Sequence, residues 1–235
     1  MATRRRKKAA KKRGVSGRTF AEGKYVSRGN SRYDRHDPLF RRAREEGYLA
    51  RSIYKLEEID NSFRLLRPGD NIIDLGSAPG SWLQYVEKEA RQNGGLVVGI
   101  DLLEVRMSFG EHVHILRGDI YETTLEELRH PNMDDDARFD VVLSDMAPNT
   151  TGVRQVDQAR SASLAERALE VGQRALAPGG NTCIKVLEGR DFHFVIERAK
   201  KLFDTVKIRR PKGTRAGSTE TYLIGLGLKE DATEL

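Results

Sequence analysis

Short apolar runs alternate with longer segments of helical period through most of this 235-residue chain. The apolar runs are four to seven residues long, a usual length for buried strands. They predict strands at residues 71–75, 96–102, 113–116, 139–144, 181–187, 205–209 and 220–226. Apolar residues spaced three or four apart predict helices at about 39–46, 52–61, 80–91, 124–128, 155–176 and 192–202. Alternating strands and helices indicate an α/β domain with a mostly parallel sheet.

A loop of small residues follows the first predicted strand and precedes a helix. From Asp74 to Gly80 it reads D-L-G-S-A-P-G. Gly76 and Gly80 can take positive φ, and their lack of a side chain lets a ligand approach the backbone. The loop lacks the G-x-G-x-x-G spacing that cradles a dinucleotide pyrophosphate. It resembles the S-adenosylmethionine loop of Rossmann-like methyltransferases, although a generic strand-to-helix turn could have the same composition.

No helix is predicted between the last two strands. Only residues 210–219 connect the strand at 205–209 to the strand at 220–226. Such a link suits an antiparallel insertion of the final strand. We therefore expect a Rossmann-like S-adenosylmethionine-dependent methyltransferase fold, with seven strands and the last one reversed.

Acidic residues stand at the carboxyl ends of three further predicted strands. Asp101 ends the second strand, Asp119 follows the third and Asp145 follows the fourth. Ligands of such sheets bind beyond the strand ends, so we expect Asp101 to hold ribose hydroxyls and Asp119 an adenine amino group. Each acid could instead cap a following helix. Trp82 could line the same pocket or pack in the core.

Charge divides the chain into two parts. The net charge is +6, but residues 1–44 carry 16 Lys and Arg against 3 Asp and Glu, so the remainder is net negative. Residues 1–36 are basic and show no apolar period, so we expect a disordered arm that binds RNA phosphates. A solubilising or targeting tail is the alternative. The methyltransferase domain is predicted at 37–228 and a C-terminal tail at 229–235.

Composition limits the remaining possibilities. No apolar run approaches the roughly 20 residues of a membrane span, so no membrane partner is expected. The single cysteine, Cys183, excludes an internal disulfide and favours a reducing, cytoplasmic location. The five histidines are scattered along the chain, so no metal site is expected. We expect the protein to act as a monomer.

Lys185 interrupts the apolar strand predicted at 181–187. A buried ammonium group requires carboxylate partners, and the strand order makes Asp145 and Glu220 the available neighbours. Lys55, on an N-terminal helix, brings a second amine to this group of charges. A lysine that reaches solvent from the strand end is the alternative interpretation.

Residues 37–228 resemble the FtsJ/RrmJ (RlmE) family of ribosomal RNA 2′-O-methyltransferases. The matching segments are R-S-x-Y-K-L at 51–56, D-L-G-x-A-P-G-x-W at 74–82, S-D-M-A-P-N at 144–149, K-V-x-x-G at 185–189, and R-P-K with S-x-E-x-Y between 210 and 222. The resemblance implies a catalytic tetrad of Lys55, Asp145, Lys185 and Glu220. Cofactor contacts are expected from Gly76, Gly80, Trp82, Asp101, Asp119 and Asp145. Ser81 departs from the pattern, since many members have glycine there.

The resemblance also implies a reaction. A methyl group would pass from S-adenosylmethionine to the 2′-hydroxyl of a uridine in large-subunit (23S) ribosomal RNA, within the ribosomal particle. Lys185 would accept the hydroxyl proton, Asp145 would orient Lys185, and Lys55 and Glu220 would position the ribose. RNA contacts are expected from Arg51, Lys55, Arg209, Arg210, Lys212 and Arg215. A tRNA ribose methyltransferase and an S-adenosylmethionine-binding ribosome assembly factor are the alternatives.

Overall fold

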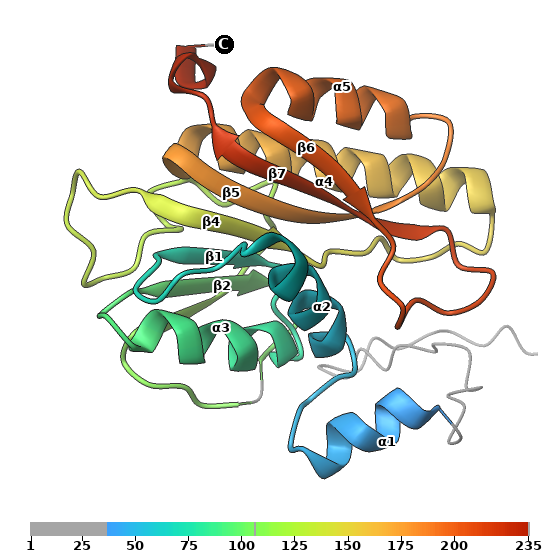
Figure 1. The fold of residues 1–235 in the computed structure, drawn as a ribbon, viewed down its shortest axis with the longest axis horizontal. Helices are drawn as coiled ribbons and strands as arrows, with labels where there is room; N and C mark the ends of the chain where they lie inside the picture. The colour runs from blue at the N-terminus through green and yellow to red at the C-terminus, as the bar shows by residue number, and fades with distance from the viewer. Residues whose placement is uncertain (1–36, 106, 235) are drawn as a thin grey trace, which may run out of the picture. The chain divides into compact units, whose positions relative to one another are not determined.

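Seven strands form one sheet in the computed structural model, which describes residues 37–105 and 107–234. Their order is β3-β2-β1-β4-β5-β7-β6 (Figure 1). The strands are β1 (Ile72–Leu75), β2 (Val97–Asp101), β3 (Val113–Arg117), β4 (Phe139–Ser144), β5 (Leu176–Leu187), β6 (Phe203–Arg209) and β7 (Glu220–Leu228). The basic arm predicted at 1–36 lies outside the described residues.

The strand directions confirm the predicted fold class. Strands β1 to β5 pair in parallel, and β7 is inserted antiparallel between β5 and β6. Because β7 runs antiparallel, its first residue lies beside the carboxyl end of β5, where Glu220 pairs with Leu187. The strand order reverses between β1 and β4, which is where sheets of this kind bind ligands.

Helices cover both faces of the sheet (Figure 1). Successive residues of a strand point to opposite faces, so Ile72 and Ile73 enter different cores. The core around Ile73 includes side chains of α4 (Arg154–Ala175) and α5 (Phe192–Leu202). The core around Ile72 includes side chains of α2 (Ile53–Phe63) and α3 (Ser81–Arg91). A third, small cluster joins α1 (Pro38–Glu45) to α2.

The helix predicted at 124–128 is wrong, because these residues form a single turn. Thr124 and Glu127 do make the reciprocal bonds of a helix start, with N–H···O distances of 2.8 and 3.3 Å. The turn stops before Pro131, which lacks an N–H and disfavours helical backbone at the preceding residue. The apolar period correctly indicated that Leu128 is buried, but the segment is too short to continue as a helix.

Strand β5 begins five residues earlier than predicted, at Leu176. Its register with β4 shifts between the pairs Phe139–Leu176 and Val141–Asn181, so β5 contains three extra residues there. Gly179 lies in this bulge with a φ of +81°, a conformation that glycine adopts without a Cβ clash. The Ala-Pro-Gly-Gly segment is therefore an irregular start of the strand.

The chain beyond β7 packs against α4. It forms a short 3₁₀ helix, η1 (Glu230–Glu234), in which Ala232 is fully buried. The Gln173 side chain donates a 2.8 Å hydrogen bond to the Ala232 carbonyl. Within the described ranges, no helix has the length and apolar character needed to cross a membrane.

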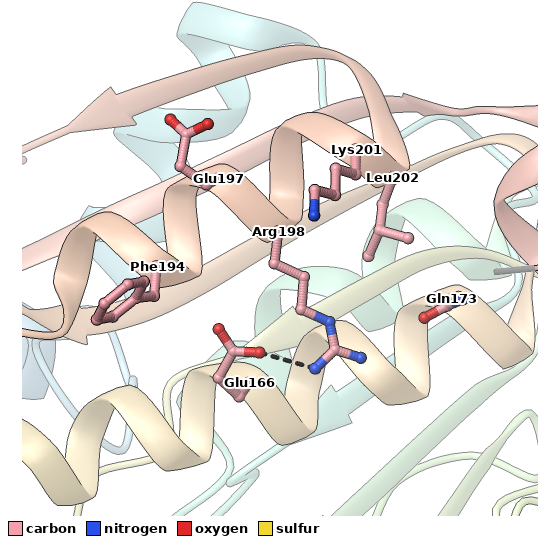
Figure 2. A pocket seen from close by; sticks show the side chains of 7 residues that line it. All are labelled: Glu166, Gln173, Phe194, Glu197, Arg198, Lys201 and Leu202. Atoms are coloured by element: carbon pink, nitrogen blue, oxygen red, sulfur yellow. Dashed lines mark hydrogen bonds and ion pairs between the residues drawn. The ribbon is translucent and has the colours of Figure 1, made fainter.

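A groove of about 690 Å³ runs between α4 and α5 (Figure 2). Arg198 of α5 pairs with Glu166 of α4 at 2.7 Å across it. None of the predicted catalytic or cofactor residues lines this groove. The residues that the sequence predicts to be catalytic or cofactor-binding therefore lie elsewhere, near the carboxyl ends of the parallel strands.

Candidate active site

The loop between β1 and α3 has the backbone conformation predicted for it. Gly76 and Gly80 have φ values of +82° and +116°. A Cβ atom on Gly76 would lie 2.8 Å from the Met146 side chain, so the end of β4 approaches this glycine closely. The Ala78 N–H donates to Asp101 Oδ2 at 2.9 Å, which ties the loop to the end of β2. The ends of β2 and β4 therefore hold the loop in place.

A pocket of about 200 Å³ opens beside this loop. It brings together three of the predicted cofactor residues, Gly76, Asp101 and Asp119. Apolar side chains complete one wall, among them Ile120 and Leu164. The pocket thus combines two carboxylates with an apolar surface, as binding of a nucleoside requires.

Backbone donors fix the two pocket carboxylates. Asp101 accepts from the Leu103 N–H at 2.8 Å in addition to the loop N–H of Ala78. Asp119 Oδ1 accepts from the Tyr121 N–H at 3.0 Å. Each carboxylate thus accepts from the N–H two residues further on, as in an Asx turn, and among the described residues no helix follows either carboxylate for it to cap. The same bonds also orient the carboxylates, so these turns and ligand binding are compatible here.

Trp82 lies beneath the site and does not line the pocket. Its side chain is 2% exposed, and its indole Nε1 donates to the Ser52 carbonyl at 3.0 Å. Its ring lies 6.0 Å from the Tyr222 ring. Gly80 and Asp145 are also outside the pocket lining, so direct cofactor contact by these three residues stays a prediction.

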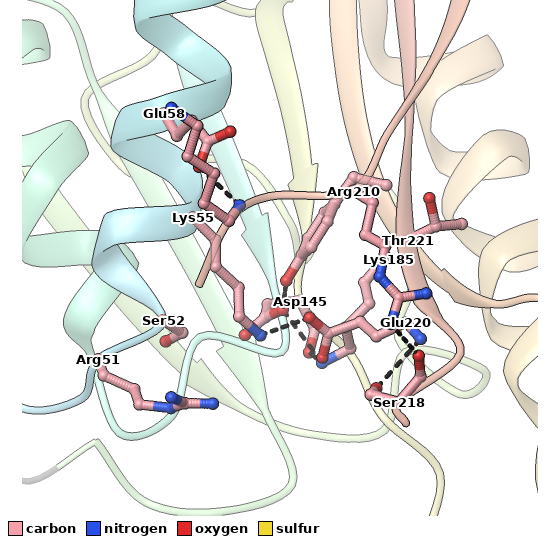
Figure 3. Close-up of polar contacts among 12 residues, drawn as sticks. Arg51, Ser52, Lys55, Glu58, Asp145, Lys185, Arg210, Ser218, Glu220 and Thr221 are labelled. Carbon is pink, nitrogen blue, oxygen red and sulfur yellow. Dashed lines mark hydrogen bonds and ion pairs between the residues drawn. The ribbon is translucent and has the colours of Figure 1, made fainter. Parts of the chain in front are cut away.

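The four charged residues form two ion pairs (Figure 3). Lys185 Nζ lies 3.0 Å from Asp145 Oδ1 and also donates to the Asp145 carbonyl. Lys55 Nζ lies 2.5 Å from Glu220 Oε1. Both lysine side chains are only 10% exposed, so each amine is largely desolvated next to a carboxylate. The sequence predicted Glu220 as a second partner of Lys185. In the structure, Glu220 pairs with Lys55 instead.

The sheet register explains this meeting of distant residues. Lys185 lies directly opposite Tyr222, and Leu187 lies opposite Glu220, because β7 is antiparallel to β5. Asp145 follows the last residue of β4, whose partner in β5 is Ile184. Helix α2 brings Lys55 over this edge of the sheet.

A comparison with known protein families identifies the chain. The model of the FtsJ-like methyltransferase family matches residues 48–228, a range that contains the loop, the pocket and the four charged residues. The chain belongs to the FtsJ-like methyltransferase family. It is therefore a methyltransferase, and the predicted family resemblance is confirmed.

Two curated relatives of this FtsJ-like methyltransferase carry the same name. The chain is 44% identical over 198 residues to ribosomal RNA large subunit methyltransferase E of Syntrophobacter fumaroxidans, covering 84% of this chain and 98% of that one. It is 43% identical to the enzyme of the same name from Sorangium cellulosum, covering 84% and 90% of the two chains. A solved ribosomal RNA methyltransferase of Plasmodium falciparum shares the fold, with a TM-score of 0.65, 24% identity, and coverage of 77% of this chain and 98% of that chain.

Tyr222 is a residue of the FtsJ-like site to which the sequence assigned no role. Its hydroxyl donates to Asp145 Oδ1 at 2.7 Å, and its side chain is fully buried. Burial first, and then the charges of Asp145 and Glu220, raise the pKa of Tyr222 well above its usual range. The hydroxyl therefore stays a donor. The sequence did contain a signal for this role. Side chains alternate between the two faces of a strand, so Tyr222 lies on the same face of β7 as Glu220.

Asp74 is a second residue without a role from the sequence. It lies on β1 and is fully buried, and neither carboxyl oxygen has a hydrogen-bond partner among the described residues. Burial, followed by repulsion from Asp145 and Asp101, raises its pKa well above the usual range. A protonated, neutral side chain is the form that this environment favours.

The predicted RNA-contacting residues surround the FtsJ-like site but are not equivalent. Arg51 pairs with Asp37 at 2.5 Å, and Arg209 pairs with Glu58 at 2.9 Å. Arg210 donates to the Ser218 carbonyl. These guanidinium groups therefore also hold the protein surface together. In the described ranges, 37–105 and 107–234, no three His, Cys, Asp or Glu side chains form a metal-binding group.

Proposed function

We propose that this FtsJ-like methyltransferase transfers a methyl group from S-adenosylmethionine to the ribose 2′-hydroxyl of a uridine in large-subunit (23S) ribosomal RNA. The observation that carries the proposal is the largely desolvated Lys185–Asp145 pair beside a pocket of about 200 Å³ that two carboxylates line. The names of the curated relatives support the RNA substrate. The substrate form that we propose is the ribosomal particle.

The residues of the pocket fit S-adenosylmethionine as the methyl donor. Asp101 and Asp119 provide acceptors for ribose hydroxyls and an adenine amino group, and Ile120 provides an apolar surface for the ring. This cofactor has no phosphate, which agrees with a glycine loop that lacks a lysine. When bound, it supplies an electrophilic methyl group on a sulfonium.

Lys185 is the proposed proton acceptor. As the bond between the ribose oxygen and the methyl carbon forms and the bond from that carbon to sulfur breaks, the hydroxyl proton passes to the Lys185 amine. The lone pair of the amine nitrogen takes up the proton. Asp145 orients the amine through the 3.0 Å contact and stabilises the ammonium that results.

Lys55 and Glu220 are proposed to position the RNA. Their 2.5 Å pair lies near the Lys185–Asp145 pair, and both side chains are less than one-fifth exposed. Lys55 can attract the phosphate next to the target ribose, and Glu220 can accept a hydrogen bond from a sugar hydroxyl. Such contacts align the 2′-oxygen for an in-line displacement.

The setting of the reaction is part of the same proposal. The single cysteine, Cys183, is buried, so no disulfide requires an oxidising compartment, and we propose a cytoplasmic monomer. The basic segment at 1–36 is proposed to add phosphate contacts.

The test offers tritiated S-adenosylmethionine with assembled large subunits, naked ribosomal RNA and tRNA in parallel. We expect label in large-subunit RNA at a uridine 2′-oxygen, located by nuclease digestion and mass spectrometry. Label in tRNA alone would support the tRNA alternative. Binding of cofactor without label in any RNA would support an assembly factor.

A further inference from the structure

Helix α2 and its N-cap present three polar residues at three-residue spacing, Ser52, Lys55 and Glu58. Side chains three apart lie near one another on a helix surface, so these residues form one stripe. Ser52 shares a 2.9 Å hydrogen bond with Ser81 at the start of α3. Lys55 holds Glu220 at the start of β7. The stripe thus contacts the start of α3 at one end and the proposed RNA side at the other.

Glu58 holds the start of the link between β6 and β7 with both carboxylate oxygens. Oε1 accepts from Arg209 Nη2 at 2.9 Å, and Oε2 accepts from the Lys212 backbone N–H at 2.8 Å. The Glu58 side chain is only 21% exposed. Bonds to an ionised acceptor are stronger than neutral ones, so this is a firm attachment.

The far end of the same link is held by the neighbouring turn of α2. Glu220, the first residue of β7, is the partner of Lys55. A Cβ atom on Gly213 would lie 3.2 Å from Leu39 of α1, so the link also passes close to α1. Two turns of α2 therefore hold both ends of residues 210–219, whose Lys212 and Arg215 are exposed.

The negative charge of Glu58 can affect RNA binding in two opposite ways. A carboxylate in this basic region repels RNA phosphates, so through charge alone it would weaken RNA binding. Its two directed bonds do the opposite, because they limit the conformations of the link before RNA arrives. The two effects predict opposite results when the charge is removed.

We propose that Glu58 is a positioning residue that holds the link at 210–219 in the conformation that receives the RNA substrate. The inference rests on the proposed function for its choice of RNA. Glu58 acts through Arg209 and the Lys212 backbone and needs no contact with RNA. This assigns Arg209 to the anchoring of the link, where the sequence predicted an RNA contact.

The test compares Glu58→Gln with Glu57→Gln, which removes the same charge one residue away. We expect Glu58→Gln to raise the KM for large subunits about tenfold, the size of one lost charge-assisted bond, with kcat and the KM for S-adenosylmethionine unchanged. Glu57→Gln should leave the KM for large subunits unchanged or lower it. Arg209→Ala combined with Glu58→Gln should add little to the single change, because both remove the same contact.

A second measurement is independent of RNA. Trypsin should cleave after Lys212 or Arg215 several-fold faster in Glu58→Gln than in Glu57→Gln at equal thermal stability. The proposal is overturned if cleavage is equal in the two variants, or if Glu58→Gln lowers the KM for large subunits. Equal loss of cofactor and RNA affinity would also overturn it, since that indicates a general defect of α2. Failure of the wild-type enzyme to methylate large subunits would instead reject the proposed function, with the protease result unaffected.

Discussion

The Tyr222 hydroxyl lies 2.7 Å from Asp145 Oδ1, the same oxygen that lies 3.0 Å from the amine of Lys185. One carboxylate oxygen therefore receives two donors from two neighbouring strands. The Tyr222 side chain is fully buried, so water does not compete with its hydroxyl for the Asp145 carboxylate. The Lys185 amine is thus oriented by a residue that is itself held in place.

Tyr222→Phe keeps the ring and removes this donor. We expect kcat to fall about tenfold, equivalent to about 1.4 kcal/mol, because Asp145 loses one of the bonds that orient it. The KM for RNA and the thermal stability should change little. Steady-state methylation of large subunits with tritiated cofactor measures the effect. An unchanged kcat would show that Lys185 alone suffices to hold Asp145.

Lys185→Ala should abolish methyl transfer while cofactor binding persists, because the amine does not line the pocket. A loss of at least 100-fold in kcat is expected for a general base. Calorimetric titration with S-adenosylhomocysteine serves as the control for an intact pocket. An active Lys185→Ala enzyme would exclude this amine as the proton acceptor.

Asp74→Asn tests the buried carboxyl on β1. The pKa of Asp74 is raised in the folded state, so the native protein retains a proton that the unfolded chain loses above its ordinary pKa of 3.8. Stability therefore falls as pH rises between that value and the folded-state pKa, by about 1.4 kcal/mol per pH unit. Asparagine does not titrate. The free energy of unfolding of the variant should therefore rise relative to that of the wild type from pH 5 to pH 8. Urea denaturation across this range measures the difference, and parallel curves would contradict a neutral Asp74.

Ser81→Gly restores the residue that many family members have. We expect a loss of about 1 kcal/mol in stability, because the 2.9 Å bond to Ser52 disappears. Ser52→Ala should cost a similar amount, and the double variant should cost little more than either alone. Chemical denaturation of the three variants tests this, and fully additive losses would show that the two hydroxyls act independently.

Removal of residues 1–36 should weaken RNA binding and flatten its dependence on salt. This segment carries 13 Lys and Arg against 2 Asp and Glu, and each phosphate contact that is lost removes about 0.7 to 0.9 from the salt slope. Affinity for S-adenosylhomocysteine should stay the same. Filter binding of RNA at several salt concentrations measures the slope, and an unchanged slope would favour the solubilising-tail interpretation.

Local patterns were sufficient for most of the fold. The apolar runs located all seven strands, and the missing helix between 209 and 220 indicated the reversed β7. The glycine loop and the anomalous Lys185 pointed to the candidate site, because close backbone approach and a buried charge each require particular residue types. These features depend on neighbours in the chain, so the sequence determines them by itself.

Tertiary structure alone decided that Glu220 pairs with Lys55 and not with Lys185. Lys55 and Glu220 are 165 residues apart in the chain, and their pairing depends on where α2 crosses the sheet edge. The same packing buries Trp82 under the site and engages Arg209 with Glu58. An ion pair requires two side chains to reach one point in space, and that point exists only after strands and helices have packed.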